Sequence, residues 1–156
     1  MNKSKLKLEQ SISECQKHIL RLEYAKTKMV VFMPLSYENY ENLKNDEITY
    51  IDQFLYRFAK LQDVIGQKLI KYIYEFLGEE IENKSFIDIF NKLEQIGVIE
   101  DLEKWTKLRE IRNELSHDYG DDIKESVERL NIIYNMYDVL IEYYNQIVSY
   151  YGKLKM

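Results

Sequence analysis

The chain has 156 residues and a formal charge of −5, because 22 Lys and Arg stand against 27 Asp and Glu. Hydrophobic residues make up 46% and charged residues 31% of the sequence, which excludes a disordered or fibrous chain and predicts one compact domain over residues 1–156. The acidic balance excludes broad electrostatic binding of nucleic acid and leaves only local, site-directed contacts with RNA or DNA.

The cysteine content and the apolar runs indicate the compartment. Cys15 is the only cysteine, so no internal disulfide can form, and this is typical of a reducing cytoplasm. The longest apolar run, residues 29–35, is too short to cross a bilayer. The lysine-rich start of the chain lacks the apolar centre of a signal peptide. We therefore expect a cytoplasmic protein with no membrane partner.

Glycine and proline are rare, and this predicts an all-α fold. Five glycines and one proline leave few residues that could separate short strands by tight turns. A first helix is predicted over residues 4–33, ending before Pro34. Its apolar residues recur at spacings of four and three on one face: Leu8, Ile12, Cys15, Ile19 and Leu22. The polar residues 36–45 form a connection that either is irregular or holds a short helical turn.

A second helix is predicted over residues 48–76, where apolar positions alternate at spacings of three and four. Such a helix is about 45 Å long at 1.5 Å per residue. Gly78 supplies the left-handed residue that commonly follows a helix end.

A short third helix follows. Ser85 and Asp88 have the spacing of a capping box, which predicts a helix start at residue 86. Gly97 closes this helix.

Two more helices complete the predicted bundle. One starts near Glu100 and ends around His117, because Gly120 follows and Asp121 and Asp122 are suited to cap the next helix. The last helix is predicted to run unbroken over residues 123–151. Four long helices and one short helix with mostly brief connections indicate an up-and-down bundle.

The apolar stripe of the last helix is wider than one helix seam requires. Its heptad positions account for the bundle core, but Ile133, Leu140 and Ile147 add a second row. We interpret the heptads as the core and the added row as a second surface to be covered, which makes it a candidate dimer contact.

Most familiar active sites are absent from the sequence. It contains no glycine-rich phosphate loop and no nucleophile elbow. Cys15 and His18 lie one helical turn apart, but two ligands do not make a zinc site, so we interpret them as a buried thiol beside a surface imidazole. The acidic run at residues 79–82 is interpreted as a solvated loop rather than a metal site. No cofactor or metal is predicted.

The exception is the segment over residues 112–119, which reads RNELSHDY. His117 can accept or donate a proton near neutral pH, and Arg112 can grip a phosphate and stabilise charge that develops on it. Together they suffice for metal-free cleavage of RNA, with the histidine acting on the 2′-hydroxyl or the leaving oxygen. DNA lacks that hydroxyl, so RNA is the predicted substrate.

Arg112, His117 and Tyr119 reproduce the pattern Arg-x4-His-x-Tyr, with Asn113 as the polar residue after the arginine. In this the sequence resembles the HepT-like toxin branch of the HEPN superfamily, the higher-eukaryote-and-prokaryote nucleotide-binding domains. The helical frame, with the motif near the start of the final helical hairpin, is similar as well. The resemblance covers an eight-residue motif and the architecture.

The resemblance implies a specific function. Family members are metal-independent endoribonucleases that act as homodimers, with the two motifs facing a shared cleft. A minimal nucleotidyltransferase antitoxin silences them by transferring AMP to the motif tyrosine. Carried over, Arg112 and His117 would be catalytic, Asn113 would support them, and Tyr119 would be the modified residue. Cytoplasmic RNA and the antitoxin are the implied partners.

Two alternatives to a toxin stay open. The superfamily also contains catalytically silent members that bind a nucleotide or substrate for a nucleotidyltransferase. In a pure interaction bundle, Arg112 would merely pair with a nearby carboxylate such as Glu114 or Asp118. The sequence places acidic residues among the basic ones along this helix, so it predicts no continuous basic track beside the motif.

Helix geometry raises one question about the motif. Arg112 and His117 are five residues apart and would point about 140° away from each other on an ideal helix. Arg112 should instead share a face with Trp105. Either the helix unwinds before His117, or a second subunit completes the site.

Overall fold

The computed structural model describes residues 2–115 and 122–155, and all regular secondary structure in these two ranges is helical. The all-α prediction is confirmed. The elements in chain order are α1 (Asn2–Met29), α2 (Tyr37–Glu41), α3 (Asn45–Val64), the π-helical segment η1 (Ile65–Leu69), α4 (Ile70–Phe76), α5 (Phe86–Gln95), α6 (Leu102–Glu114), α7 (Ile123–Asn135) and α8 (Tyr137–Leu154).

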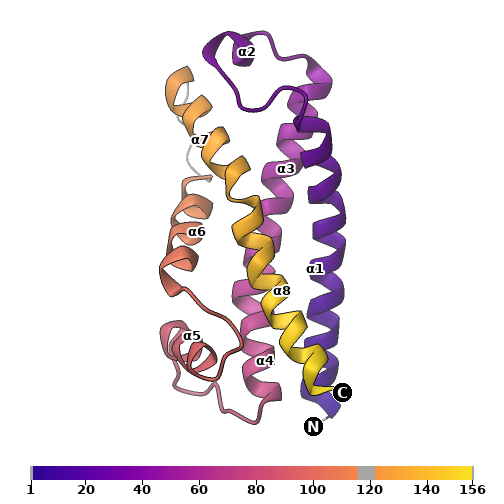
Figure 1. Ribbon diagram of the computed structural model, residues 1–156, viewed down its shortest axis with the longest axis vertical. Helices are drawn as coiled ribbons and strands as arrows, with labels where there is room; N and C mark the ends of the chain where they lie inside the picture. The colour runs from indigo at the N-terminus through magenta and orange to yellow at the C-terminus, as the bar shows by residue number, and fades with distance from the viewer. Residues whose placement is uncertain (1, 116–121, 156) are drawn as a thin grey trace.

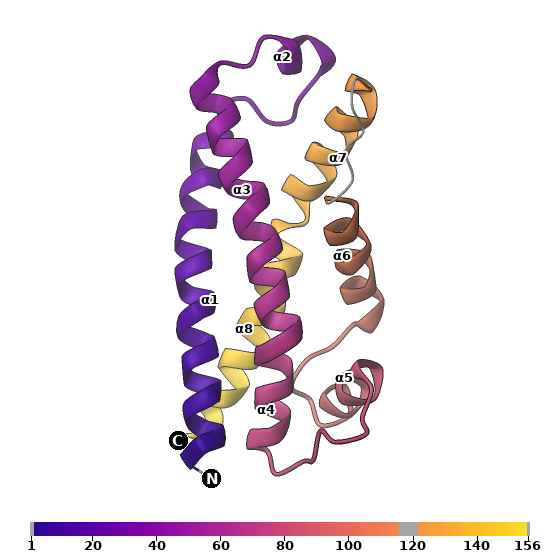
Figure 2. The ribbon, with the colours of Figure 1, turned by 180° about the vertical axis from the view of Figure 1, so that it is seen from behind.

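The helices form an elongated bundle (Figure 1). α1 and the continuous rod α3–η1–α4 run antiparallel along the length of the molecule, and α8 crosses against them. α5 and α6 lie on the side of the rod away from α1, and the two chain ends lie together (Figure 2). None of the helices in the described part of the chain combines the length and apolar character needed to cross a bilayer.

The first connection differs from the prediction in detail. α1 ends at Met29, four residues before the predicted end, and the Met33–Pro34 peptide bond is cis. Residues 36–45 do hold a short helix, because the Ser36 hydroxyl accepts a hydrogen bond from the Asn39 backbone N–H at 3.1 Å and caps α2. The choice left open by the sequence is therefore settled in favour of a helical turn.

The long second helix is confirmed, with one irregularity. It runs from Asn45 to Phe76, and the π-helical segment Ile65–Leu69 interrupts its regular α-helical hydrogen bonding. Gly78 follows with φ +90°, as predicted.

The short third helix also agrees with the prediction. The Ser85 side chain accepts from the Asp88 backbone N–H, and the Asp88 carboxylate accepts from the Ser85 N–H in return, so the capping box is present. Gly97 lies just beyond the end of α5 with φ +86°.

The prediction of one unbroken last helix is wrong, because the chain bends at Met136 between α7 and α8. Met136 has ψ −1°, far from the value of about −42° that is typical of an α-helix. Its N–H still bonds to Ile132 O at 3.1 Å, and its own carbonyl accepts from Leu140 N at 3.1 Å. Since these bonds keep the helical phase across the bend, the apolar periodicity continues and the sequence pattern does not reveal the break.

The prediction that the added apolar row on the last helix forms a second surface, to be covered by another subunit, is also wrong. Ile133, Leu140 and Ile147 are each 0% exposed within the protomer. Two neighbouring helices, α6 and α1, cover α8, as the contacts of Tyr143 and Tyr151 show. Tyr143 packs edge-on against Trp105 of α6 at 5.1 Å between ring centroids. The Tyr151 hydroxyl donates to Glu9 of α1 at 2.7 Å. The wide stripe therefore fills the protomer's own core.

Candidate functional site

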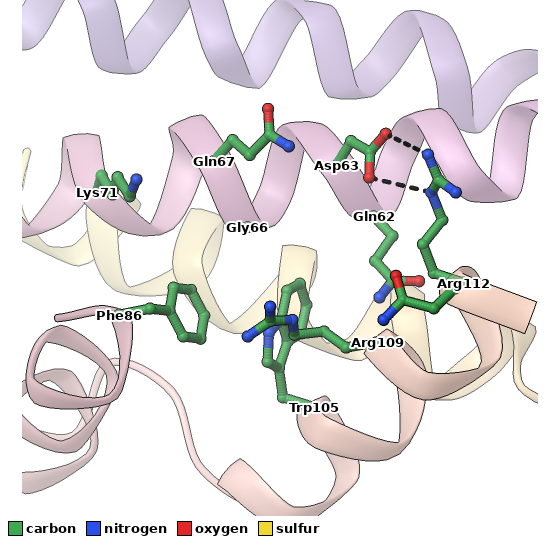
Figure 3. Close-up of a pocket in the computed structure, with 10 residues that line it drawn as sticks. Gln62, Asp63, Gly66, Gln67, Lys71, Phe86, Trp105, Arg109 and Arg112 are labelled. Atoms are coloured by element: carbon green, nitrogen blue, oxygen red, sulfur yellow. Dashed lines mark hydrogen bonds and ion pairs between the residues drawn. The ribbon is translucent and has the colours of Figure 1, made fainter.

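Arg112 spans the gap between α6 and α3. The buried residues Trp105, Leu108 and Ile111 fix α6 against the core, and Arg112 follows at the last turn. Its guanidinium donates two hydrogen bonds to Asp63 of α3, from Nε to Oδ1 at 3.2 Å and from Nη2 to Oδ2 at 3.1 Å (Figure 3). This fork-to-fork geometry fixes both the position and the plane of the guanidinium.

A cavity of about 290 Å³ lies between the α3–η1–α4 rod and α6. Its walls come from four helical segments and from the start of α5 (Figure 3). The residues that line it are Gln62, Asp63, Gly66, Gln67, Lys71, Phe86, Trp105, Arg109, Arg112 and Asn113.

The cavity is cationic in a chain of negative net charge. Lys71, Arg109 and Arg112 line it, against the single carboxylate of Asp63. Within the part of the chain that the structure describes, Lys71 and Arg109 form no ion pair. The Arg109 guanidinium instead lies 5.8 Å from the centre of the Phe86 ring. A cluster of this composition favours an anionic ligand.

Two buried polar atoms in the cavity wall lack partners. Gln62 is 3% exposed and Trp105 is 2% exposed. Neither Gln62 Oε1 nor Trp105 Nε1 has a hydrogen-bond partner among residues 2–115 and 122–155. Burying such a group unpaired costs about 1–3 kcal/mol. Both residues line the cavity, but these two atoms themselves are buried from solvent.

Gly66 allows the cavity floor to form. It lies in η1, and a Cβ atom built on it would stand 2.9 Å from Cζ2 of Trp105. Because Trp105 is buried and stacked on Phe86 at 6.0 Å between ring centroids, the indole has little room to move away. π-Helical segments of this kind are frequent at functional sites.

A second cavity of about 280 Å³ lies on the other side of the ion pair and shares Asp63 and Arg112 with the first. We call it the apolar groove. Its other lining residues are Leu55, Tyr56, Ala59, Lys60 and Leu115. Tyr56 is 54% exposed. The Arg112–Asp63 pair thus forms a wall common to both cavities.

The residues of the sequence motif divide into two sets. Arg112 and Asn113 both line the cationic cavity, and Arg112 shares the cavity face of α6 with Trp105, as helix geometry predicted. His117 and Tyr119 lie outside the described residues. α6 ends at Glu114, earlier than the predicted end around His117.

The carboxylate that pairs with Arg112 was not found from the sequence. It is Asp63, 49 residues away along the chain, rather than the near neighbour Glu114. Lys71 was missed as well, and so was the cavity-facing role of Arg109. The basic cluster is assembled across helices, so no continuous track marks it. The one available signal is the spacing of Arg109 and Arg112, which puts both on one helix face.

The interpretation of the Cys15–His18 pair is half confirmed: the thiol is buried, but His18 is not a surface imidazole, because its side chain is only 13% exposed. Cys15 is fully buried, and burial raises the pKa of its thiol from 9.0 to about 12. His18 Nδ1 lies 3.0 Å from Nη1 of Arg57. Partial burial and, after it, the positive charge of Arg57 lower the pKa of His18. Among the described residues, no three His, Cys, Asp or Glu side chains gather in an arrangement that could hold a metal ion.

Comparisons with known proteins give no relative: no family model, curated protein or solved structure matches the chain. The chemistry of the site is therefore inferred from its own residues.

Proposed function

We propose that the protein is the toxin of a toxin–antitoxin pair, a metal-independent endoribonuclease in which Arg112 and His117 perform the chemistry. The observation that supports this is the position of Arg112, whose guanidinium is held by Asp63 at the edge of a cationic cavity. An arginine fixed in this way can receive a phosphodiester without reorganising.

The donors of Arg112 divide between two tasks. Nε and Nη2 each give one hydrogen to Asp63. The Nη1 group and the second hydrogen of Nη2 form the other edge of the guanidinium, and this edge can grip two phosphate oxygens. Asn113, which lines the same cavity, adds a carboxamide donor beside it. These groups stabilise the negative charge of a pentavalent phosphate.

His117 supplies the acid–base chemistry. The imidazole takes the proton of the 2′-hydroxyl, and the 2′-oxygen attacks phosphorus. The bond from phosphorus to the 5′-oxygen breaks, and that oxygen takes the proton back from the imidazolium. The products are a 2′,3′-cyclic phosphate and a 5′-hydroxyl. Proton transfer of this kind contributes about 10²–10⁴-fold to the rate.

The proposal includes a homodimer. With Ile133, Leu140 and Ile147 buried in the protomer, the contact must use another surface. The apolar groove is the better candidate, because it adjoins Arg112 and exposes Tyr56. A second copy seated there would bring two motifs to one cleft. Light scattering should then give about twice the chain mass of 18.9 kDa, and Tyr56→Glu should give the monomer.

Control by an antitoxin completes the proposal. A nucleotidyltransferase would transfer AMP to Tyr119, adding bulk and negative charge two residues from His117 and competing with RNA for the arginine. Tyr119→Phe should stay toxic when the antitoxin is co-expressed. Mass spectrometry of the silenced wild-type protein should find an adenylyl group on the peptide that contains Tyr119, and full silencing without that mass would rule this step out.

The decisive experiment is inducible expression in bacteria with growth and RNA integrity followed together. The wild type should arrest growth and cleave RNA, and the purified protein should retain cleavage in EDTA. Arg112→Ala and His117→Ala should lose both effects while circular dichroism stays unchanged. Lys107→Gln on the exposed side of α6 is the matched control and should remain toxic. A toxic His117→Ala variant would refute the proposal.

One observation favours a second candidate function. Arg112 is already neutralised by Asp63 in a bidentate pair, as expected of an arginine that organises a binding site without catalysing a reaction. In that case the protein would be a non-catalytic partner that presents a nucleotide or substrate to a nucleotidyltransferase. It would leave RNA intact in the expression experiment while co-purifying with that enzyme.

A further inference from the structure

We propose that His18 of α1 and Arg57 of α3 form an acid-sensitive latch between these two helices, which run side by side (Figure 2). The neutral imidazole of His18 closes the latch by accepting a hydrogen bond from the guanidinium, and protonation of the imidazole opens it. The latch lies in the seam between α1 and α3 rather than in the cationic cavity, so it does not depend on the function proposed above.

The contact between the two side chains fixes the protonation state of His18. Its Nδ1 atom lies 3.0 Å from Nη1 of Arg57. A guanidinium keeps its protons throughout the pH range in which proteins are folded, so Arg57 is the donor. Nδ1 must therefore be the acceptor, which leaves the single imidazole hydrogen on Nε2. This arrangement exists only while His18 is neutral.

Arg57 depends on His18 for its attachment to α1. In the part of the chain that the structure describes, the guanidinium forms no ion pair, and His18 is its only hydrogen-bond partner. Its Nε atom is buried without a partner among the same residues. The guanidinium carbon also lies 5.3 Å from the centre of the Tyr56 ring, but Tyr56 belongs to α3 as well. Loss of the imidazole acceptor would therefore release Arg57 from α1.

The charges near His18 make a proton there unfavourable. The charged groups that act on the imidazole come from three elements: Arg57 and Lys60 of α3, Lys68 of η1, and Glu14 of α1. Burial and, after it, the charge of Arg57 lower the pKa of His18, whereas Glu14 raises it. A proton on Nδ1 would face the guanidinium across 3.0 Å, so repulsion would replace the hydrogen bond.

Glu14 offers the protonated imidazole a second arrangement. Its Oε1 atom accepts a hydrogen bond from Nζ of Lys68 at 2.9 Å, and its Oε2 atom lies 4.0 Å from Nε2 of His18. A proton turns this longer contact into an ion pair, because the imidazolium is a cation with a hydrogen on each nitrogen. Acid thus exchanges a contact between α1 and α3 for a contact within α1.

Cys15 reports on the seam, because it lies one turn from His18, is fully buried and is the only cysteine in the chain. A pyridyl disulfide, which reacts with thiols even in mild acid, is a suitable probe. Its rate with the folded protein is divided by its rate with the urea-unfolded protein at the same pH. From about pH 7.5 to about pH 5.5 this ratio should rise several-fold, with about tenfold as the limit for one histidine whose pKa is 6.5 when exposed.

His18→Asn should abolish that rise. The amide oxygen of asparagine can replace Nδ1 as the acceptor, and it does not titrate in this pH range. Lys28→Gln is the matched control, because it removes an exposed cation from the same helix ten residues away and should leave the rise unchanged.

NMR measures the titration of His18 directly. The chain has two histidines, so His18 alone titrates in His117→Ala. Its midpoint should lie below pH 6.5. Adding Arg57→Gln should raise the midpoint because a neighbouring cation is lost, and adding Glu14→Gln should lower it because the favourable carboxylate is lost.

Three results would overturn the proposal. The first is a midpoint at or above pH 6.5, or one that Arg57→Gln does not change. The second is an equal rise in Cys15 labelling in the wild type and in His18→Asn. The third is a lowered midpoint without any rise in labelling, because the seam would then stay closed when His18 is protonated. The NMR result does not require His18→Asn to fold, so the proposal can be refuted without that variant.

Discussion

Asp63 and Arg112 join α3 to α6 through two parallel hydrogen bonds of 3.1 and 3.2 Å. The side chains are 30% and 33% exposed, respectively, so water screens the pair, and its contribution to stability should be at most about 1 kcal/mol. Its geometric effect is larger, because the pair fixes the plane of the guanidinium at the edge of the cavity. We therefore regard Asp63 as a positioning residue.

The first prediction separates these two effects. Asp63→Ala should lower the free energy of unfolding by less than about 1 kcal/mol in a urea titration. For the RNA cleavage proposed above, it should also lower kcat about tenfold or more, because Arg112 loses its orientation. The exchanged pair Asp63→Arg with Arg112→Asp should recover stability but not cleavage. An Asp63→Ala variant that cleaves at the wild-type rate would show that the ion pair does not position Arg112.

The second prediction concerns the close contact at Gly66. Gly66→Ala forces a Cβ atom to within 2.9 Å of the buried Trp105 ring, so it should destabilise the protein by about 1–3 kcal/mol and shift the tryptophan emission. Gly152→Ala in α8 is the matched control, since a Cβ atom added there would meet nothing within 4 Å. Better helix propensity should make that variant more stable by up to about 1 kcal/mol. Thermal melts of both proteins test this, and a more stable Gly66→Ala would contradict the packing described.

The third prediction follows from the burial of α8. Leu140 is 0% exposed, so Leu140→Ala should destabilise the protomer by about 2–5 kcal/mol. Ile132→Ala on the neighbouring helix α7, at a position that is 52% exposed, should change stability by no more than about 0.5 kcal/mol. Denaturation and light scattering should be measured together. If Leu140→Ala instead gave a stable, dissociated monomer, the row would be an interface after all.

The fourth prediction uses the pKa of Cys15. Burial raises it from 9.0 to about 12, so above about pH 9 the unfolded chain releases a thiol proton that the folded chain retains. The raised folded pKa therefore means that stability is retained below pH 9 and is lost as the pH rises toward 12. Between about pH 8 and about pH 10 the wild type should lose about 1 kcal/mol more than Cys15→Ala does. Equal losses, measured by urea titration at both pH values, would contradict this.

The local features of the fold were predictable because they depend on neighbouring residues. The capping box of Ser85 and Asp88 and the left-handed Gly78 require particular residue types at fixed spacings, and both are present. The bend at Met136 was not predictable, since the helical hydrogen bonds continue through it and the apolar period does not change. The stripe through Leu140 was misread because the width of a stripe does not tell whether a neighbouring helix or a second copy covers it.

The residues of the candidate site also fall into a group that the sequence predicted and a group that it did not. The contiguous motif pointed to Arg112 and Asn113, and both line the cavity. Asp63, Gln62 and Lys71 come from the second helix and meet Arg112 only through the packing of α3 and α4 beside α6. No spacing along the chain encodes that meeting. A one-dimensional pattern can therefore identify a candidate residue but not the residues from other helices that surround it.

The shared wall between the two cavities has a thermodynamic consequence. Asp63 and Arg112 line the cationic cavity and the apolar groove alike. A ligand that draws the guanidinium toward one cavity changes the shape and the charge of the other. Linkage then requires reciprocity: if a ligand in the cavity favoured association through the groove by some free energy, association would favour binding of that ligand by the same free energy. Ligand binding in the cationic cavity and association through the apolar groove would thus be coupled through these two side chains.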